Sequence, residues 1–166
     1  MDEIKEFVQS IYKAWVDKNY PKEDNSAEKY YMICKEPSKL NFQALSMTTG
    51  VTFDDIFFPK KKLLVKRIND FMEGKIKLPK FSILLHGKPG GGKTSFIKAL
   101  YNLTKCHIIN INLNDFKNFD DLFKVFHEES VRINTDTTDV SYNKVKIPIN
   151  KRIYLIEDID AQDKIV

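Results

Sequence analysis

The sequence predicts an α/β fold in which helices flank a parallel sheet. Short apolar runs at residues 81–86, 107–112 and 152–157 alternate with amphipathic stretches at residues 93–103 and 120–129. Strands that alternate with helices in this way form parallel sheets covered on both faces. A glycine-rich loop joins the first run to the first helix. The composition, 42% hydrophobic and 30% charged, is that of a soluble globular protein.

A small α/β segment is expected ahead of this fold. The runs at residues 29–35 and 40–46 are typical of two short strands joined by a turn. An amphipathic helix precedes them, and its polar side mixes both charge signs, which favours packing on its own domain over lying on a membrane. We therefore expect an N-terminal segment at residues 1–50 and the main α/β part at residues 51–166. The apolar face of the helix consists of Ile4, Phe7, Val8, Ile11, Tyr12, Trp15 and Val16.

Another helix is predicted between Pro59, which suits a first helical turn, and Gly74, which suits a helix end. The three lysines at residues 60–62 are expected to be a solvated first turn, with a phosphate contact as the alternative. Farther along the chain, the polar insertion at residues 131–151 is either a mobile surface loop or a disordered segment. The sequence does not distinguish between these two states.

Charge and cysteine usage narrow the function classes. The 27 basic and 23 acidic side chains give a net charge of +4, which does not require nucleic acid or anionic lipid as a partner. Cys34 and Cys106 match no zinc or redox spacing, so we expect buried thiols and no metal cluster. No signal peptide is visible, and no run approaches the roughly twenty apolar residues that span a bilayer. A cytoplasmic or nuclear protein is expected.

The glycine-rich loop satisfies the pattern G-x-x-x-x-G-K-[ST] in full, with a predicted strand before it and a predicted helix after it. Its glycines allow backbone N–H groups to turn toward phosphate oxygens, and the helix start adds its positive end. We expect Lys93 to reach the β- and γ-phosphates of ATP and the Thr94 hydroxyl to bind Mg²⁺. The expected nucleotide-binding residues are Gly87, Lys88, Pro89, Gly90, Gly91, Gly92, Lys93, Thr94 and Ser95.

An acidic pair follows the last predicted strand. Glu157 and Asp158 lie at its carboxyl end, where open parallel sheets bind their ligands. One carboxylate there can hold the metal, usually through water, and its neighbour can orient or deprotonate the attacking water. With Lys93, these two residues are the predicted catalytic groups. Asp160 contacts a neighbouring subunit or caps a helix in this interpretation.

These motifs carry a resemblance to a known family. The runs ILLHGKPGGGKTSFIKAL, HIININL and RIYLIEDIDA are similar to AAA ATPases of the mitochondrial Rieske-protein chaperone type and their relatives in protists and large DNA viruses. The resemblance covers residues 51–161 and implies that Glu157 is the metal-linked carboxylate and Asp158 the water-activating one. It also implies a ring-shaped homo-oligomer that acts on a protein client. Enrichment in Lys, Asn, Ile and Phe suits a viral genome.

The same resemblance predicts an incomplete sheet. In the family's sheet, the fourth strand lies between the strand before the loop and the strand before Glu157. In sequence, this fourth strand would come after residue 166, as would the fifth strand, a polar sensor residue and the arginine fingers. Arg152 would lie at the wrong end of its strand to act as an arginine finger, and neither Arg67 nor Arg132 is part of a recognised motif. We expect a longer protein, a second chain that completes the sheet, or rearranged strands.

Three function classes follow from these residues. The first is an ATP-hydrolysing module of a protein-remodelling ring, supported by the loop and the acidic pair together. The second is a truncated module that binds nucleotide without hydrolysing it, supported by the expected incomplete sheet. The third is a loader ATPase associated with nucleic acid, which the charge permits but no motif indicates. A nucleotide kinase also shares the loop, but no phosphate-acceptor site is visible. The first class is preferred.

Overall fold

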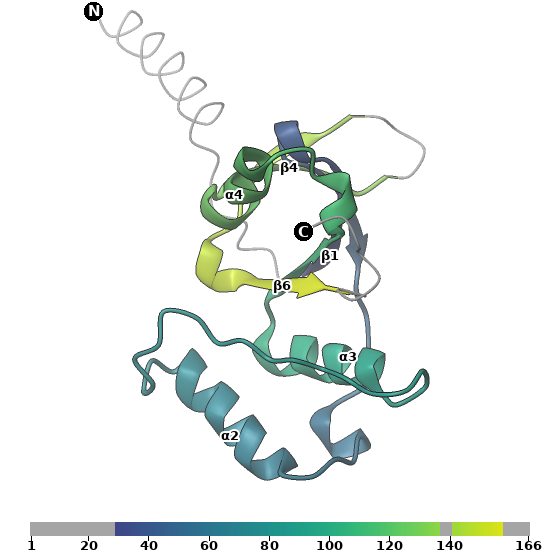
Figure 1. Ribbon diagram of the computed structural model, residues 1–166, viewed down its shortest axis with the longest axis vertical. Helices are drawn as coiled ribbons and strands as arrows, with labels where there is room; N and C mark the ends of the chain where they lie inside the picture. Colours follow the sequence, from purple (N-terminus) through teal and green to yellow (C-terminus); the bar gives the residue numbers. More distant parts are fainter. Residues whose placement is uncertain (1–28, 137–140, 158–166) are drawn as a thin grey trace, which may run out of the picture. The chain divides into compact units, whose positions relative to one another are not determined.

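The computed structural model describes residues 29–136 and 141–157. The chain divides into two compact units (Figure 1), one made of Met1–Met47 with Cys106–Val166 and the other of Thr48–Lys105. The predicted amphipathic helix at residues 4–16 lies outside the described residues, and the boundary expected at residue 50 remains a prediction.

The first unit is built on a six-stranded sheet with the order β5-β4-β2-β1-β3-β6. Three of its strand pairs are parallel, as the alternation of strands and helices predicts, and two are antiparallel, so the sheet as a whole is mixed. The α/β class itself is confirmed. The strands are β1 (Tyr30–Glu36), β2 (Asn41–Ser46), β3 (His107–Ile111), β4 (Ser130–Asn134), β5 (Asn143–Lys146) and β6 (Arg152–Ile156).

The two short strands predicted near the N-terminus form an antiparallel hairpin, β1 and β2. Between them a single 3₁₀ turn, η1 (Pro37–Lys39), ends at Leu40, whose positive φ of 53° reverses the chain. The hairpin also pairs in parallel with β3 on one side and β4 on the other. It is therefore an integral part of the main sheet.

One helix of this unit, α4 (Phe119–His127), packs on one face of the sheet. Its first turn is capped by Asn118, whose side chain accepts a hydrogen bond of 2.9 Å from the Asp121 amide. Alternate strand residues fill the core beneath it, as the period of two predicts. This core contains Met32, Phe42, Ala44, Ile109, Ile111, Val125, Val131 and Ile133.

The insertion expected to be a loop or disordered is partly a strand pair. Strands β4 and β5 lie at its two ends and pair antiparallel, with Val131 opposite Val145. Both valines contribute to the core, so burial of apolar side chains outweighs the polar character of the segment. Residues 137–140 lie outside the described residues. Two further 3₁₀ turns, η3 (Leu113–Asp115) and η4 (Ile149–Lys151), precede α4 and β6.

The second unit contains α2 (Lys61–Met72) and α3 (Lys93–Thr104), both close to their predicted ranges, and the turn η2 (Phe53–Asp55). Phe53, Ile68, Phe96 and Ala99 form its buried cluster. The Lys61 ammonium donates hydrogen bonds to the carbonyls of Phe53 and Ile56, at 2.9 and 3.0 Å. For this lysine the expected solvated first turn was wrong, because its charge fixes the turn η2 against the start of α2.

Residues 81–86 were predicted to be a buried parallel strand, and this prediction was wrong. The run forms no strand among the described residues, and Leu84 is 80% exposed. Ile83 and Leu85 pack against the buried cluster of the second unit, whereas Leu84 between them is exposed. The side chains therefore alternate as in a strand, but the backbone pairs with no strand among the described residues. A strand needs a neighbour for its N–H and C=O groups, which a local hydrophobic pattern cannot supply.

Candidate functional site

The glycine-rich loop adopts a conformation that only glycine tolerates well. Gly87, Gly90 and Gly92 have positive φ values of 146°, 77° and 85°. Between them, the Gly91 amide donates a hydrogen bond of 3.0 Å to the Lys88 carbonyl, and a Cβ at Gly91 would lie 3.0 Å from the same oxygen. A side chain at any of these four glycines would therefore strain the loop or crowd its backbone.

Lys93 is the first residue of α3, and its side chain folds back over the loop. Its Nζ donates hydrogen bonds to the carbonyl oxygens of Gly87 and Lys88, at 2.9 and 3.3 Å. Both acceptors are neutral carbonyls, and the lysine is partly exposed. A phosphate oxygen would be a stronger partner for this ammonium than either carbonyl, because hydrogen bonds between ionised groups are roughly twice as strong.

The N-terminus of α3 opens directly onto this loop. Gly92 is the N-cap residue and provides no side-chain cap, and the first turn contains no acidic side chain. Thr94 is exposed and Ser95 is half-buried on that turn. Uncapped N–H groups, the positive end of the helix and an adjacent ammonium are the elements of an anion site. The exposed Thr94 hydroxyl is chemically suited to bind a divalent cation.

Glu157, the predicted metal carboxylate, follows the last residue of β6 and is exposed. The Asn110 amide on β3 donates to Glu157 Oε2 at 3.2 Å and to Tyr31 Oη at 2.6 Å. Asn110 thus connects strands β1 and β3 to the carboxylate at the end of β6. Burial, reinforced by the Glu157 charge, raises the pKa of Tyr31, whereas the hydrogen bond to Asn110 lowers it.

The predicted site residues are distributed over both units. The loop, Lys93, Thr94 and Ser95 lie together in Thr48–Lys105, whereas Glu157 belongs to the unit that contains the sheet. Asp158 and Asp160 lie outside the described residues. Sequence reasoning missed Asn110 and Tyr31. The signal that could have found the first is an asparagine inside the apolar run HIININ.

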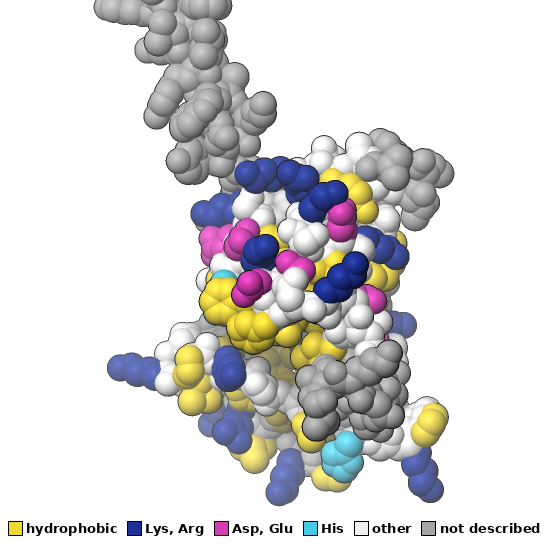
Figure 2. All heavy atoms as spheres, turned by 45° about the horizontal axis from the view of Figure 1, so that its top comes forward, with side chains coloured by type: hydrophobic (Ala, Val, Ile, Leu, Met, Phe, Trp, Pro, Cys, Tyr) yellow, Lys and Arg dark blue, Asp and Glu magenta, His cyan; other side chains and the backbone are white. Residues whose placement is uncertain are grey.

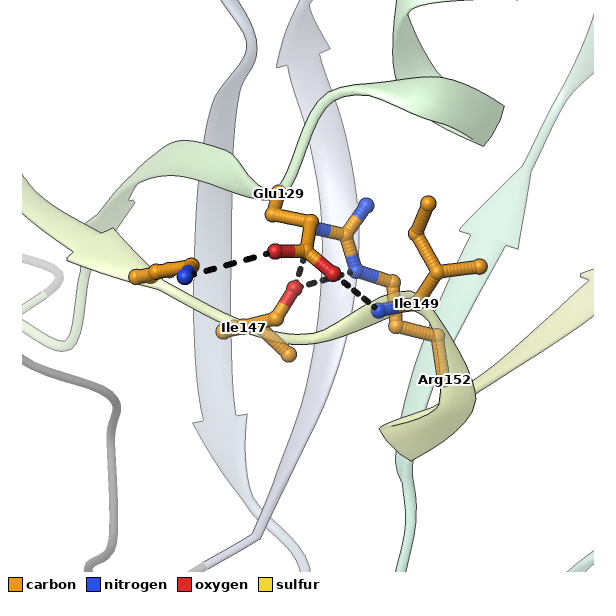
Figure 3. Close-up of polar contacts among 5 residues, drawn as sticks. Glu129, Ile147, Ile149 and Arg152 are labelled. Carbon is orange, nitrogen blue, oxygen red and sulfur yellow. Dashed lines mark hydrogen bonds and ion pairs between the residues drawn. The ribbon is translucent and has the colours of Figure 1, made fainter.

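Arg152 serves the sheet rather than the loop. It is 7% exposed, and its guanidinium donates to the carbonyls of Ile147 and Val125. Figure 3 shows this side chain beside the segment of Ile147 and Ile149, where Glu129 accepts a hydrogen bond from the Ile149 amide. A buried arginine whose donors are bound to backbone carbonyls fits a structural role, which agrees with the expectation that Arg152 is no arginine finger.

Other site classes are not indicated in the described part of the chain. Residues 29–136 and 141–157 contain no group of three or more His, Cys, Asp or Glu side chains arranged to hold a metal ion. Within the same ranges, no helix has the length and apolar character that a membrane crossing requires. Cys34 and Cys106 are both buried, and they form no disulfide among the described residues, as predicted.

Comparisons with known proteins agree with the loop and the fold. Residues 83–164 match the family described as ATPase family associated with various cellular activities (AAA). The chain is 35% identical to toxin zeta of Streptococcus pyogenes over 80 residues, which cover 43% of this chain and 28% of the relative. It is 34% identical to the replication factor C large subunit of Aeropyrum pernix over 65 residues, or 39% of this chain and 13% of the relative.

The match spans less than a third of either relative's length. No solved structure matches the chain. Together, the family match and the two partial relatives support a nucleotide-binding ATPase module, and the mixed α/β fold is consistent with the AAA family.

Proposed function

We propose that this chain binds ATP and Mg²⁺ at the loop of residues 87–95 and acts as an ATP-hydrolysing AAA-type module. The observation that carries the proposal is the geometry of the loop. Three glycines with positive φ lead into the uncapped start of α3, and the Lys93 ammonium lies over the loop carbonyls. These groups together suit the β- and γ-phosphates of a nucleotide.

The proposed roles follow the chemistry of each side chain. Lys93 transfers its hydrogen bonds from the loop carbonyls to phosphate oxygens, and the Thr94 hydroxyl holds Mg²⁺. Glu157 holds the metal through water, and Asp158 orients and deprotonates the attacking water. Bound Mg²⁺ supplies neutralisation of the charge that develops on the phosphates. Asn110 keeps the Glu157 carboxylate in place through the hydrogen bond from its amide.

The wider role of the module is proposed from likeness. The resemblance to AAA ATPases of the Rieske-protein chaperone type supports a ring-shaped homo-oligomer that remodels or translocates a protein client. The family match at residues 83–164 is consistent with the ATPase part of this proposal. A truncated module that binds nucleotide without turnover is the alternative, and the hydrolysis assay below separates the two.

The direct test is calorimetric titration of the chain with ATP in the presence of Mg²⁺. Lys93→Ala is expected to weaken ATP binding roughly 10- to 100-fold, because a hydrogen bond to a charged group contributes about 1.5–3 kcal/mol. Lys98→Ala, which removes an exposed lysine from the same helix, is the matched control and should bind ATP as the unmodified chain does. Equal ATP affinity in all three proteins would refute the proposed site.

Turnover is measured separately, as phosphate release dependent on Mg²⁺. Asp158→Asn is expected to abolish hydrolysis and to retain ATP binding, since it removes the proposed base and leaves the loop intact. An unchanged rate of hydrolysis in the Asp158→Asn protein would refute the role of Asp158 as the base that activates water. Binding without any turnover in the unmodified chain would instead support the non-hydrolysing module.

One observation favours a second candidate, a loader ATPase that works on nucleic acid. The similarity to a replication factor C large subunit covers 39% of the chain. This candidate predicts binding to fluorescently labelled single-stranded DNA that weakens steeply as salt is added. Absence of DNA binding at low salt would rule out this second candidate function.

A further inference from the structure

A polar pocket lies in the unit that contains the sheet. It has a volume of about 300 Å³, is open to solvent, and is lined by residues of η1, the end of α4, and strands β4 and β5. Four of its lining side chains are basic and one is acidic. The lining consists of Ser38, Lys39, Leu40, Lys124, Glu128, Ser130, Arg132 and Lys144.

Two of these basic residues face each other across adjacent strands. Arg132 on β4 and Lys144 on β5 are direct partners in the antiparallel register. Like charges placed opposite each other destabilise a sheet. Neither residue forms an ion pair with a carboxylate among residues 29–136 and 141–157. The Arg132 charge is compensated in part, because it contributes to the lowered pKa of Glu36, after that carboxylate's contacts with Lys39 and Asn41.

The other two basic residues of the pocket are compensated. Lys39 pairs with Glu36 at 2.7 Å and Lys124 pairs with Asp121 at 3.5 Å. Glu128 remains as the acidic residue of the lining, and it forms no ion pair within the described ranges. Four basic side chains set against Glu36, Asp121 and Glu128 leave an excess of one positive charge at the pocket.

One unpartnered buried hydroxyl, that of Ser130, lines the pocket, whereas the unpartnered Asn41 Oδ1 nearby in the sheet is an acceptor that an anion does not satisfy. Within the described residues, Asn41 Oδ1 and Ser130 Oγ are the buried side-chain atoms that have no hydrogen-bond partner. Ser130 lines the pocket, and Asn41 on β2 is the register partner of Arg132. The Ser130 hydroxyl has a hydrogen to donate, and burying it without a partner costs free energy. An acceptor placed in the pocket would remove this cost.

We propose that this pocket binds a small phosphate dianion, either free phosphate or a phosphate monoester. The guanidinium of Arg132 presents paired donors that match phosphate oxygens, and Lys144 adds a second charge. The volume lies at the lower end for ligand sites, which suits a small ligand. Figure 2 shows basic and acidic side chains interspersed on the face that it draws.

The test follows backbone amide resonances of the full chain during titration with sodium phosphate. Saturable shifts of the Leu40, Ser130 and Arg132 amides are expected, separate from shifts in the nucleotide loop. Sodium chloride at equal ionic strength should not produce them. Arg132→Gln should weaken this binding at least 10-fold and leave the loop shifts unchanged, and Lys66→Gln on α2 should change neither.

Absence of saturable shifts at these amides, or equal shifts in the Arg132→Gln protein, would overturn the proposal. Because loop resonances are followed in the same spectra, failure here is distinguishable from failure of the nucleotide site. Titration with glycerol phosphate identifies the source of the anion. Tighter binding than for inorganic phosphate indicates a monoester, and weaker binding indicates free phosphate.

A second measurement does not depend on ligand identity. Lys144→Gln should raise the melting temperature by about 1–3 °C at low salt, since it removes the like-charge pair, and this gain should vanish at high salt. Phosphate should raise the melting temperature of the unmodified chain more than that of the Lys144→Gln protein. Equal stabilisation of both proteins by phosphate would contradict an anion site at the pair.

Discussion

Replacing Arg152 with methionine tests whether a buried arginine ties the sheet to its surroundings. The guanidinium donates to the Ile147 carbonyl through Nε at 3.0 Å and also through Nη2, and to the Val125 carbonyl through Nη1 at 3.2 Å. Ile147 is fully buried, so its carbonyl has little access to replacement water. Methionine fills a similar volume but donates nothing.

The expected loss follows from these acceptors. An orphaned buried carbonyl costs about 1–3 kcal/mol, which applies in full to Ile147. Val125 loses less, about 1 kcal/mol, because the Tyr154 hydroxyl also donates to its carbonyl, at 3.4 Å. The free energy of unfolding should therefore fall by about 2–4 kcal/mol, a large part of the usual total of about 5–15 kcal/mol.

Urea unfolding followed by far-ultraviolet circular dichroism measures this loss. With a slope near 2 kcal/mol per molar urea, inside the usual range of about 1–3, the midpoint should move down by roughly 1–2 M. Arg67→Met on α2 is the matched control because Arg67 is exposed, and its effect should stay within about 0.5 kcal/mol. A midpoint for Arg152→Met that matches the control would show that desolvation of the charge cancels its hydrogen bonds, which would refute the reasoning.

Two further predictions concern other residues of the sheet. Asn110→Leu should raise the Mg²⁺ concentration needed for half-maximal ATP hydrolysis several-fold, because it removes the hydrogen bond that holds the Glu157 carboxylate. ATP binding without metal should not weaken. An unchanged Mg²⁺ requirement would contradict this prediction. Burial, with Asp115 adding to it, raises the pKa of Cys34 to about 12, so the folded state keeps this thiol neutral while the unfolded state ionises above about pH 8.5. The free energy of unfolding should therefore fall as pH rises from about 8.5 to 12. In urea titrations at several pH values, Cys34→Ala should reduce this pH dependence by at most about 1.4 kcal/mol per pH unit. The same pH dependence in both proteins would contradict the prediction.

The elements predicted correctly are those with local signals. Helix α2 lies between a proline and a glycine that favour its two ends, and α4 starts at an asparagine cap with acidic residues in its first turn. Strands β3 and β6 are short apolar runs whose burial fixes their place in the sheet. In each case, residues close in sequence decide the conformation, so a single sequence is enough.

The misses share a different cause. Strands β4 and β5 lie in a segment of polar composition, and only Val131, Ile133 and Val145 on one face mark them as strands. The pairing of the N-terminal hairpin with β3 joins residues more than seventy positions apart, such as Tyr31 and Ile108. No local pattern encodes that contact. Sheet order and the direction of pairing are set by long-range packing, which the alternation of elements cannot specify.

The candidate site divides in the same way. The loop of residues 87–95 is a local structure, because its glycines and the helix that follows determine where its N–H groups point. The surroundings of Glu157 are not local, because Asn110 reaches it from a strand that ends forty-six residues earlier. The loop conformation on which the proposed phosphate binding depends could thus be predicted from one stretch of sequence. The orientation of the metal carboxylate depends on the assembled sheet, and Asn110→Leu separates the two contributions, since it alters the second and leaves the first intact.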